Sequence, residues 1–420
     1  MGQSKLKTLK ACLVMRAPIE LYPPSVYQAE LLEEEGFEVA VLDTEDGAPA
    51  ACQLRPSIRR IVLEKTRGPA TTRQLLHRIG APFRRQLFKT RAVHWLKRLC
   101  PDVVISYEPP AIAAIGSDAV RDKTVRVWHL HEYPELCADL GIGTRRSIGW
   151  VWKNASEADA IWFPDANRAE LFAKSVAPIP TVEIIRNFPR VLANVPSPCL
   201  RTLLRQQHVV DRGFLVLYCG SVGADHGLET TIQGMGQWPI ASLFVLVGPC
   251  APAFRSKLLG IAHKFGVADR VVFVGAAAPD TLWSIRASAD VAVTISEPRS
   301  INYKLHAGAS NKRFETMAVG VPQVTNGGTG LTEIIEGNGI GICVPHDQPE
   351  AIGRAIAQLL MNENLRREMG NRARRLHLQR FNYETEFKPV LERLVESIRD
   401  RRNERQTTRG RPLCAGLPDT

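Results

Sequence analysis

The chain has 420 residues, 45% of them hydrophobic and 23% charged, and its formal net charge at pH 7 is +11. This length allows two domains of ordinary size, each with its own core, and the composition excludes a fibrous or largely disordered protein. No stretch of the sequence approaches the ~18 apolar residues that a membrane-spanning helix needs.

The N-terminus and the cysteines both favour a cytoplasmic protein. The first apolar run, residues 11–15, is shorter than the core of about 7–15 residues that a secretory signal peptide requires. The nine cysteines are odd in number and include no C-x-x-C pair, a pattern that fits neither a disulfide framework nor a zinc site.

Short apolar runs alternate with amphipathic segments along the chain, which is typical of α/β folds with parallel sheets. In the first half we expect a helix at about residues 25–35 and strands at residues 11–15, 38–42, 60–63, 103–106, 124–128, 160–163 and 182–185. In the second half we expect strands at residues 215–219, 243–247, 271–274, 291–294, 323–325 and 340–344. This count predicts two doubly wound domains, residues 1–188 and 199–380, joined by a proline-containing linker. The tail, residues 401–420, has almost nothing to bury and is expected to be disordered.

Residues 296–325 contain a loop that opens onto a short helix beside a strand end. Ser310 is a good N-cap residue, and Gly320 followed by Pro322 marks the end of the helix. The N-terminus of a helix offers unpaired backbone N–H groups and about half a positive charge, which suits an anionic ligand. Glu315 lies one turn into the helix, where its carboxylate can accept hydrogen bonds from sugar hydroxyls.

This stretch resembles the donor-binding signature of the retaining glycosyltransferases of family 4, which runs Asn-Tyr, a gap, then Asn-Lys-x-Phe-Glu-x-Met-Ala-x-Gly-x-Pro. The matching positions are Asn302, Tyr303, Asn311, Lys312, Phe314, Glu315, Met317, Ala318, Gly320 and Pro322. The family places a second glutamate eight residues before the one equivalent to Glu315, and this chain has Ala307 there. The resemblance implies the GT-B architecture: two Rossmann-like domains that face each other across a cleft, with an acceptor in the first, a nucleotide sugar in the second, and a last helix, about residues 381–400, that crosses back.

A glycine-rich turn, residues 217–229, lies between a predicted strand and a predicted helix. Backbone amides approach a phosphate closely only where side chains are absent, which explains Gly220, Gly223 and Gly227. A dinucleotide site is the alternative, but its G-x-G-x-x-G spacing differs from the spacing here. Where the family usually has an arginine and a lysine on the donor diphosphate, this chain has Ser221 and His226, and Lys312 is expected to supply the missing cation.

Two further elements resemble the same family. His131 follows a predicted strand in a segment similar to His-Glu-x-x-Pro-Glu, whose histidine lies beside the transferred sugar. A zinc site that includes His129 and a histidine merely packed at the strand end are the alternatives. The loop at residues 327–330 resembles the family's Gly-Gly-x-x-Glu element, which implies donor contacts from Gly328, Thr329 and Glu333; a simple turn is the alternative.

A basic segment, residues 55–98, holds thirteen Lys or Arg residues against one acid, Glu64. Apolar residues recur in its second half at helical spacing, and basic amphipathic helices bind anionic membrane surfaces. A solvated basic face is the alternative, and nucleic-acid binding is not expected because no recognisable module is present.

The resemblance therefore implies a hexosyltransferase that moves a sugar with retention from a nucleoside-diphosphate sugar to an acceptor hydroxyl. From the charge of the basic segment we expect the protein to work at the cytoplasmic face of the inner membrane, on an acceptor that is lipid-linked or a polysaccharide precursor. We expect His131, Lys312 and Glu315 to act in catalysis. The expected donor contacts are Gly220, Ser221, Gly223, His226, Gly227, Asn311, Gly328, Thr329 and Glu333. No metal or other cofactor is expected, since no Asp-x-Asp pairing is present. A GT-B sugar-nucleotide epimerase and a non-catalytic partner with the same fold are the alternatives.

Overall fold

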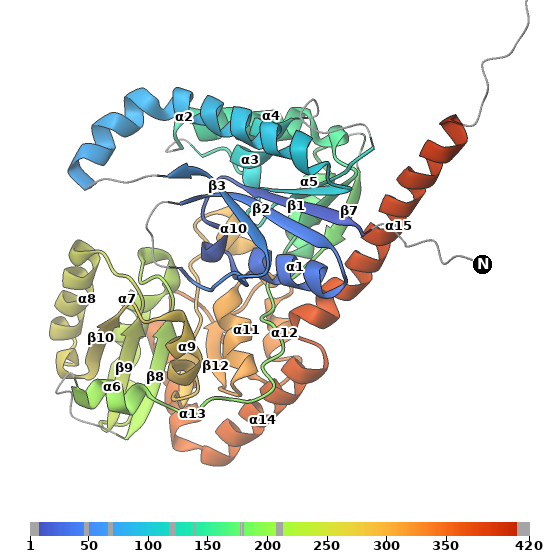
Figure 1. Cartoon of the computed structure of the whole chain (residues 1–420). Coiled ribbons are helices and arrows are strands. Elements are labelled where there is room, and N and C mark those ends of the chain that lie inside the picture. The colour runs from blue at the N-terminus through green and yellow to red at the C-terminus, as the bar shows by residue number, and fades with distance from the viewer. Residues whose placement is uncertain are drawn as a thin grey trace, which may run out of the picture.

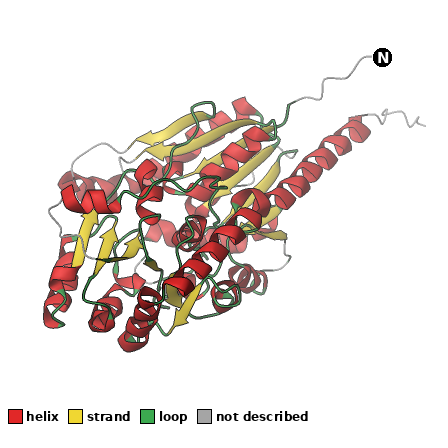
Figure 2. Ribbon diagram, turned by 90° about the horizontal axis from the view of Figure 1, so that it is seen from below, coloured by secondary structure: helices red, strands yellow, loops and turns green. Residues whose placement is uncertain are grey.

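The computed structural model describes residues 8–45, 50–65, 70–116, 123–137, 140–176, 178, 180–206 and 213–409, with the backbone alone for residues 70–79, 81, 82 and 404–409. The described chain forms two parallel sheets, each covered by helices on both faces (Figures 1 and 2). Every predicted strand is present. The predicted and observed ends differ most in the second strand, which was predicted to end at residue 42 and extends to Glu45. The sequence thus predicted the α/β class and the doubly wound order correctly.

The first sheet has seven strands in the order β3-β2-β1-β4-β5-β6-β7. Its strands are β1 (Lys10–Met15), β2 (Glu38–Glu45), β3 (Arg59–Lys65), β4 (Val103–Tyr107), β5 (Val125–His129), β6 (Ala160–Phe163) and β7 (Thr181–Ile184). Successive side chains point to opposite faces of a strand, so Leu13 and Cys12 belong to different cores. Helices α2 (Ala70–Leu99), α3 (Glu108–Ile115), α4 (Ile142–Lys153) and α5 (Ala166–Ala173) cover one face, and α1 (Pro23–Glu34) and α15 (Tyr383–Arg409) cover the other.

The second sheet has six strands in the order β10-β9-β8-β11-β12-β13. They are β8 (Phe214–Cys219), β9 (Ser242–Val247), β10 (Val271–Gly275), β11 (Val291–Val293), β12 (Gln323–Asn326) and β13 (Gly341–Val344). The helices around them are α6 (Leu200–Gln206), α7 (Leu228–Gly234), α8 (Pro252–Lys264), α9 (Pro279–Arg286), α10 (Ile301–Lys304), α11 (Asn311–Ala318), α12 (Leu331–Ile335), α13 (Pro349–Met361) and α14 (Glu363–Gln379). Residues 185–199 connect the two sheets without a helix or strand.

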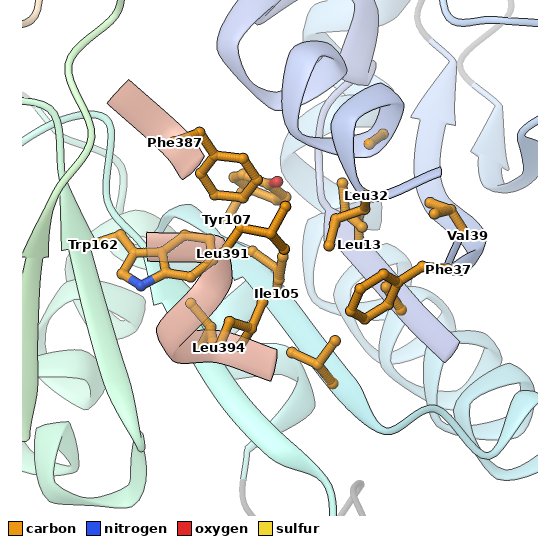
Figure 3. Close-up of a cluster of buried hydrophobic side chains, with 14 of the residues drawn as sticks. Leu13, Leu32, Phe37, Val39, Ile105, Tyr107, Trp162, Phe387, Leu391 and Leu394 are labelled. Carbon is orange, nitrogen blue, oxygen red and sulfur yellow. The ribbon is translucent and has the colours of Figure 1, made fainter. Parts of the chain in front are cut away.

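The last helix, α15, leaves the second domain and packs on the first sheet (Figure 1). Phe387, Leu391 and Leu394 point from α15 toward side chains of the first sheet, among them Ile105 and Trp162 (Figure 3). The helix also runs past residue 401 to Arg409, so the prediction of a disordered tail is wrong for residues 401–409. The physical reason is electrostatic, because the guanidinium groups at positions 401 and 402 donate hydrogen bonds to carboxylates at the edge of the first domain, those of Asp159 and Asp102. Residues 410–420 lie outside the described residues.

The apolar side of α2 is part of a core. Phe88, Ala92 and Leu96 are buried against Cys12, Leu42, Leu63 and Val104 of the sheet. The expectation that this stripe faces a membrane is therefore wrong for the described part of the helix, because the stripe is needed to cover the sheet. Among the residues that the structure describes, no helix is long and apolar enough to cross a bilayer.

Candidate active site

Each sheet reverses its strand order at one point, and ligands in open α/β sheets bind beyond the carboxyl ends of the strands at such a point. The reversal lies between β1 and β4 in the first sheet and between β8 and β11 in the second. A cavity of about 780 Å³, here called the interdomain cavity, lies at the second reversal and is lined by both domains. A smaller one of about 380 Å³, the N-domain cavity, lies at the first reversal.

The interdomain cavity collects six of the residues that the sequence predicted to act on a donor: Gly220, Ser221, His226, Asn311, Lys312 and Glu315. Six other predicted residues do not line it: Gly223, Gly227, Gly328, Thr329, Glu333 and His131. The loop at residues 327–330 is exposed and opens α12 with Gly330 in the left-handed region, φ +75°. Gly328, Thr329 and Glu333 therefore lie on the surface outside this cavity.

The turn after β8 needs glycine for steric reasons. A Cβ atom at Gly220, where φ is +152°, would lie 3.3 Å from Cε of Lys312. A Cβ atom at Gly227, where φ is +59°, would lie 2.4 Å from the Ile295 side chain. The first glycine thus makes room for the lysine, and the second lets the start of α7 pack against the strand end.

Helix α11 presents its N-terminus to the interdomain cavity through Ser310 and Asn311. The Ser310 side chain occupies the N-cap position and makes no capping hydrogen bond, which leaves the first N–H groups to water or a ligand. Phe314 and Met317 are buried in a core on the opposite side, and Gly320 ends the helix with φ +72°. The helix is thereby fixed with its positive end toward the cavity.

Lys312 brings its ammonium group to the glycine turn. Its Nζ donates a hydrogen bond to the Tyr218 hydroxyl at 2.9 Å and lies 3.4 Å from Nδ1 of His226. Within the described residues no carboxylate forms an ion pair with it. Burial, with a smaller contribution from Arg313, lowers the pKa of Lys312 to about 7. Burial and Lys312 lower the pKa of His226 to about 3, so of these two side chains His226 is neutral and the lysine carries the positive charge.

Glu315 is paired with an arginine that the sequence did not single out. Nη2 of Arg286, the last residue of α9, donates a hydrogen bond to Oε2 of Glu315 at 2.6 Å. Both side chains are nearly buried, with 9% and 12% of their surface exposed, and both line the interdomain cavity. Helices α9 and α11 thus place one cation and one anion side by side in its wall.

His131 lies behind the cavity wall. Its ring is stacked between those of Tyr22 and Tyr107, and its Nε2 lies 2.8 Å from the Ser25 hydroxyl. Burial lowers its pKa to about 3. The side chain lines neither cavity, so the expected contact with a transferred sugar is not made in this structure. As for the zinc alternative, the described residues hold no group of three or more His, Cys, Asp or Glu side chains that could bind a metal.

Glu132, the next residue, lines both cavities. The loop that carries it is held by Glu108, whose Oε1 accepts the backbone N–H groups of His131 and Glu132 at 2.7 and 3.3 Å. Glu108 has a positive φ of 60°. Burial, together with the Glu132 charge, raises its pKa to about 8. A strained, buried carboxyl therefore orients the loop between the two cavities.

The loop around α10 is tied to the first domain. The Asn302 amide pairs with the backbone N–H and C=O of Tyr133 at 2.7 and 3.1 Å. The Arg168 guanidinium donates to the carbonyl oxygens of His131, Asn302 and Leu305 at 2.5 to 2.6 Å. Arg168 also lines the interdomain cavity. The Asn-Tyr part of the sequence motif thus connects the second domain to the first. The spacing of the motif in the sequence did not predict this contact between domains.

Comparisons with known proteins show similarity to glycosyltransferases. The model of the glycosyl transferases group 1 family matches residues 201–376. A GDP-mannose-dependent alpha-(1-6)-phosphatidylinositol monomannoside mannosyltransferase of Mycobacterium tuberculosis is 24% identical over 230 residues, which are 54% of this chain and 59% of the relative. The N-acetyl-alpha-D-glucosaminyl L-malate synthase of Bacillus anthracis is 32% identical over 155 residues, 35% of this chain and 37% of that one. The matched regions thus span less than two thirds of these relatives.

Solved structures cover more of the chain. A sucrose-phosphate synthase from Thermosynechococcus elongatus superposes with a TM-score of 0.70 and 18% identity over 93% of this chain and all of the other. HepE of Anabaena in complex with UDP gives a TM-score of 0.67 at 18% identity, over 93% of this chain and 100% of that one. At such identity the likeness establishes the fold. The chain has the two-domain GT-B fold, and its residues 201–376 match the model of the glycosyl transferases group 1 family.

Proposed function

We propose that the protein transfers a hexose, with retention of configuration, from a nucleoside-diphosphate sugar to an acceptor hydroxyl. The observation that carries this proposal is the interdomain cavity, where an ammonium group without a carboxylate partner, a helix N-terminus and a glycine turn converge. These are the groups that suit a diphosphate. Its volume of about 780 Å³ is in the range of about 300–1,000 Å³ typical of ligand pockets.

In this reaction the bond between the sugar and the diphosphate breaks, and negative charge develops on the leaving diphosphate. The Lys312 ammonium and the N-terminal N–H groups of α11 are already directed at the cavity, so they stabilise that charge without reorganisation. Glu315 is one turn further along and is suited to hold hydroxyl groups of the donor. Retention follows when the acceptor hydroxyl attacks from the face that the diphosphate leaves.

The N-domain cavity is the proposed acceptor site. It shares Glu132, Ser300 and Asn302 with the interdomain cavity, so an acceptor bound there lies next to a donor. Carboxyl groups and aromatic rings, among them those of Glu108, Glu135, Tyr22 and Tyr107, line its wall. Such groups bind the hydroxyls and apolar faces of a saccharide.

We propose further that the acceptor is lipid-linked or a polysaccharide precursor, and that the protein attaches peripherally to the cytoplasmic face of the inner membrane. Support comes from relatives: the mycobacterial enzyme is named for a phosphatidylinositol mannoside, and a structural neighbour, WaaG, for lipopolysaccharide biosynthesis. The basic segment adds exposed charges at Lys89, Lys97 and Arg98, and Phe83 of the same helix is 73% exposed.

The test is a screen of radiolabelled nucleotide sugars with a membrane extract as the source of acceptor, run with and without a metal chelator. We expect label to move from one nucleotide sugar into a lipid or glycan fraction, with the same rate in the chelator. Free nucleotide formed without any acceptor would favour the epimerase alternative. Tight nucleotide binding without turnover on any extract would favour a non-catalytic partner.

A further inference from the structure

Arg286 is a buried arginine with most of its hydrogen-bonding capacity unused. A guanidinium has five N–H donors, and among the described residues this one makes a single hydrogen bond, from Nη2 to Glu315. Its Nε is enclosed and has no partner, although the residue is only 7% exposed. Because Nε is enclosed, a ligand cannot reach it, and the donors that remain for an acceptor are those of the two Nη nitrogens; since buried polar groups are almost always hydrogen-bonded, these unused donors indicate a missing acceptor.

The position of Arg286 shows where that acceptor lies. The guanidinium lines the interdomain cavity together with Cys219, Gly220 and Ser221 at the end of β8. The Trp283 ring lies against it, with its centroid 5.4 Å from Cζ. The bond to Glu315 and this ring contact hold the group between the glycine turn and α11.

The charges around the cavity show what Arg286 adds. Among the described residues that line it, the charged side chains are three cations and two acids: Arg168, Arg286, Lys312, Glu132 and Glu315. The two histidines, His226 and His306, are neutral at pH 7, since burial lowers their pKa to about 3 and about 2. Without Arg286 the cavity wall would therefore carry no net charge, and with it the wall is positive.

We propose that Arg286 binds the diphosphate of the nucleotide sugar and supplies the second positive charge that the glycine turn lacks at Ser221 and His226. This inference rests on the proposed function and adds a residue from α9, outside the sequence motifs, to the donor site. A diphosphate between Arg286 and Lys312 is held by two cations, and its oxygens accept hydrogen bonds from the unused Nη donors of the guanidinium. Glu315 then has two tasks, to hold Arg286 through Oε2 and to accept donor hydroxyls through Oε1.

A purely structural role is the rival explanation, in which Arg286 only orients Glu315. The two explanations differ in which part of the ligand is affected. If Arg286 contacts the diphosphate, its removal weakens binding of nucleoside diphosphates and not of nucleosides. If it only orients Glu315, its removal weakens binding of both.

The experiment is titration calorimetry of the full chain with two series of probes. One series is uridine, UMP and UDP, and the other is guanosine, GMP and GDP. The series that the wild type binds more tightly is then used for the variants. We expect Arg286→Met to weaken binding of the diphosphate at least tenfold and of the nucleoside less than twofold. Arg286→Lys should recover part of the loss, because it keeps the charge. The control Arg367→Met removes an exposed arginine of α14 and should change neither affinity.

The double variant Arg286→Met with Glu315→Gln removes the buried unpaired carboxylate, so it keeps the test valid if the single variant does not fold. The double variant should bind the nucleoside diphosphate at least tenfold more weakly than the single variant Glu315→Gln does. Equal losses for nucleoside and diphosphate, or no loss, would overturn the inference. A wild type that binds neither series would instead count against the proposed function.

Discussion

The ammonium group of Lys312 lies 2.9 Å from the hydroxyl of Tyr218 and 4.8 Å from the centroid of the same ring. Both partners are neutral, so the cation gains a hydrogen bond and a cation–π contact but no counter-charge. The net effect of its enclosure is a pKa lowered to about 7. A diphosphate that enters the cavity provides the missing negative charge, and binding and protonation of this lysine are therefore coupled.

This coupling predicts a pH dependence of donor binding. Diphosphate prefers the protonated lysine, which predominates below pH 7 and is lost as pH rises through about 7. We therefore expect the affinity for a nucleoside diphosphate to fall between pH 7 and pH 9, with a limiting slope of about tenfold per unit. The two neighbouring arginines stay charged over most of this range, since the pKa of Arg286 is raised and that of Arg313 is about 10.

Calorimetry at several pH values and in buffers of different ionisation enthalpy measures both the affinity and the proton uptake. Lys312→Met should cost about 2 kcal/mol at pH 7, as expected for a charge-assisted bond, and should flatten the profile. A wild-type affinity that does not change between pH 7 and pH 9 would show that Lys312 does not contact the diphosphate.

Glu315→Gln tests the second motif residue. The change removes a carboxylate that is suited to accept donor hydroxyls, so the nucleoside should bind about 1–3 kcal/mol more weakly. The same change leaves Arg286 without its counter-charge, which strengthens attraction for a diphosphate. The loss should therefore be larger for the nucleoside than for the nucleoside diphosphate. An unchanged nucleoside affinity would remove Glu315 from the donor site.

His131→Ala tests whether this histidine acts in chemistry or in packing. The structure shows a ring stacked on two tyrosines and hydrogen-bonded to Ser25, so removal should lower the free energy of unfolding by about 2–4 kcal/mol. The control is His263→Ala, which changes an exposed histidine of α8 and should leave the free energy of unfolding unchanged. A variant that melts like the wild type but has lost turnover would restore the catalytic interpretation.

The sequence predicted the strands and the short helix of the donor motif because both depend on local patterns. Apolar runs bounded by glycine and proline located every strand, and the glycine and proline after residue 318 marked the end of α11. Arg286 could not be found in this way. Nothing in its neighbours along the chain distinguishes it from a surface arginine, and its role appears only when α9 and α11 pack together.

The placement of His131 shows the opposite limit. The motif located a loop that lines both cavities, but residues 131 and 132 form a bend after β5, and sequence spacing does not give the directions of side chains in a bend. Here Glu132 faces both cavities and His131 faces the core.

The basic segment tests the proposed membrane attachment. Since Phe88, Ala92 and Leu96 cover the sheet, attachment through α2 has to be mainly electrostatic. Lys89 and Lys97 are exposed on this helix, and each basic residue near an anionic leaflet contributes about 1 kcal/mol within a Debye length of ~8 Å. Reversal of both charges, K89E with K97E, should therefore weaken binding to phosphatidylserine vesicles by at least 2 kcal/mol, roughly thirtyfold.

The matched control places the same charge change on the second domain, as K264E with R367E, at two exposed positions of α8 and α14. If α2 is the docking face, the control binds anionic vesicles almost as well as the wild type, although both double variants have the same net charge. Both variants should bind nucleoside diphosphates normally, because neither pair of residues lines the interdomain cavity. Binding of the wild type should also fall as salt rises. Equal partitioning of the wild type onto neutral and anionic vesicles at low salt would contradict electrostatic attachment, and equal losses in the two double variants would show that net charge, rather than the face formed by α2, directs the protein to the membrane.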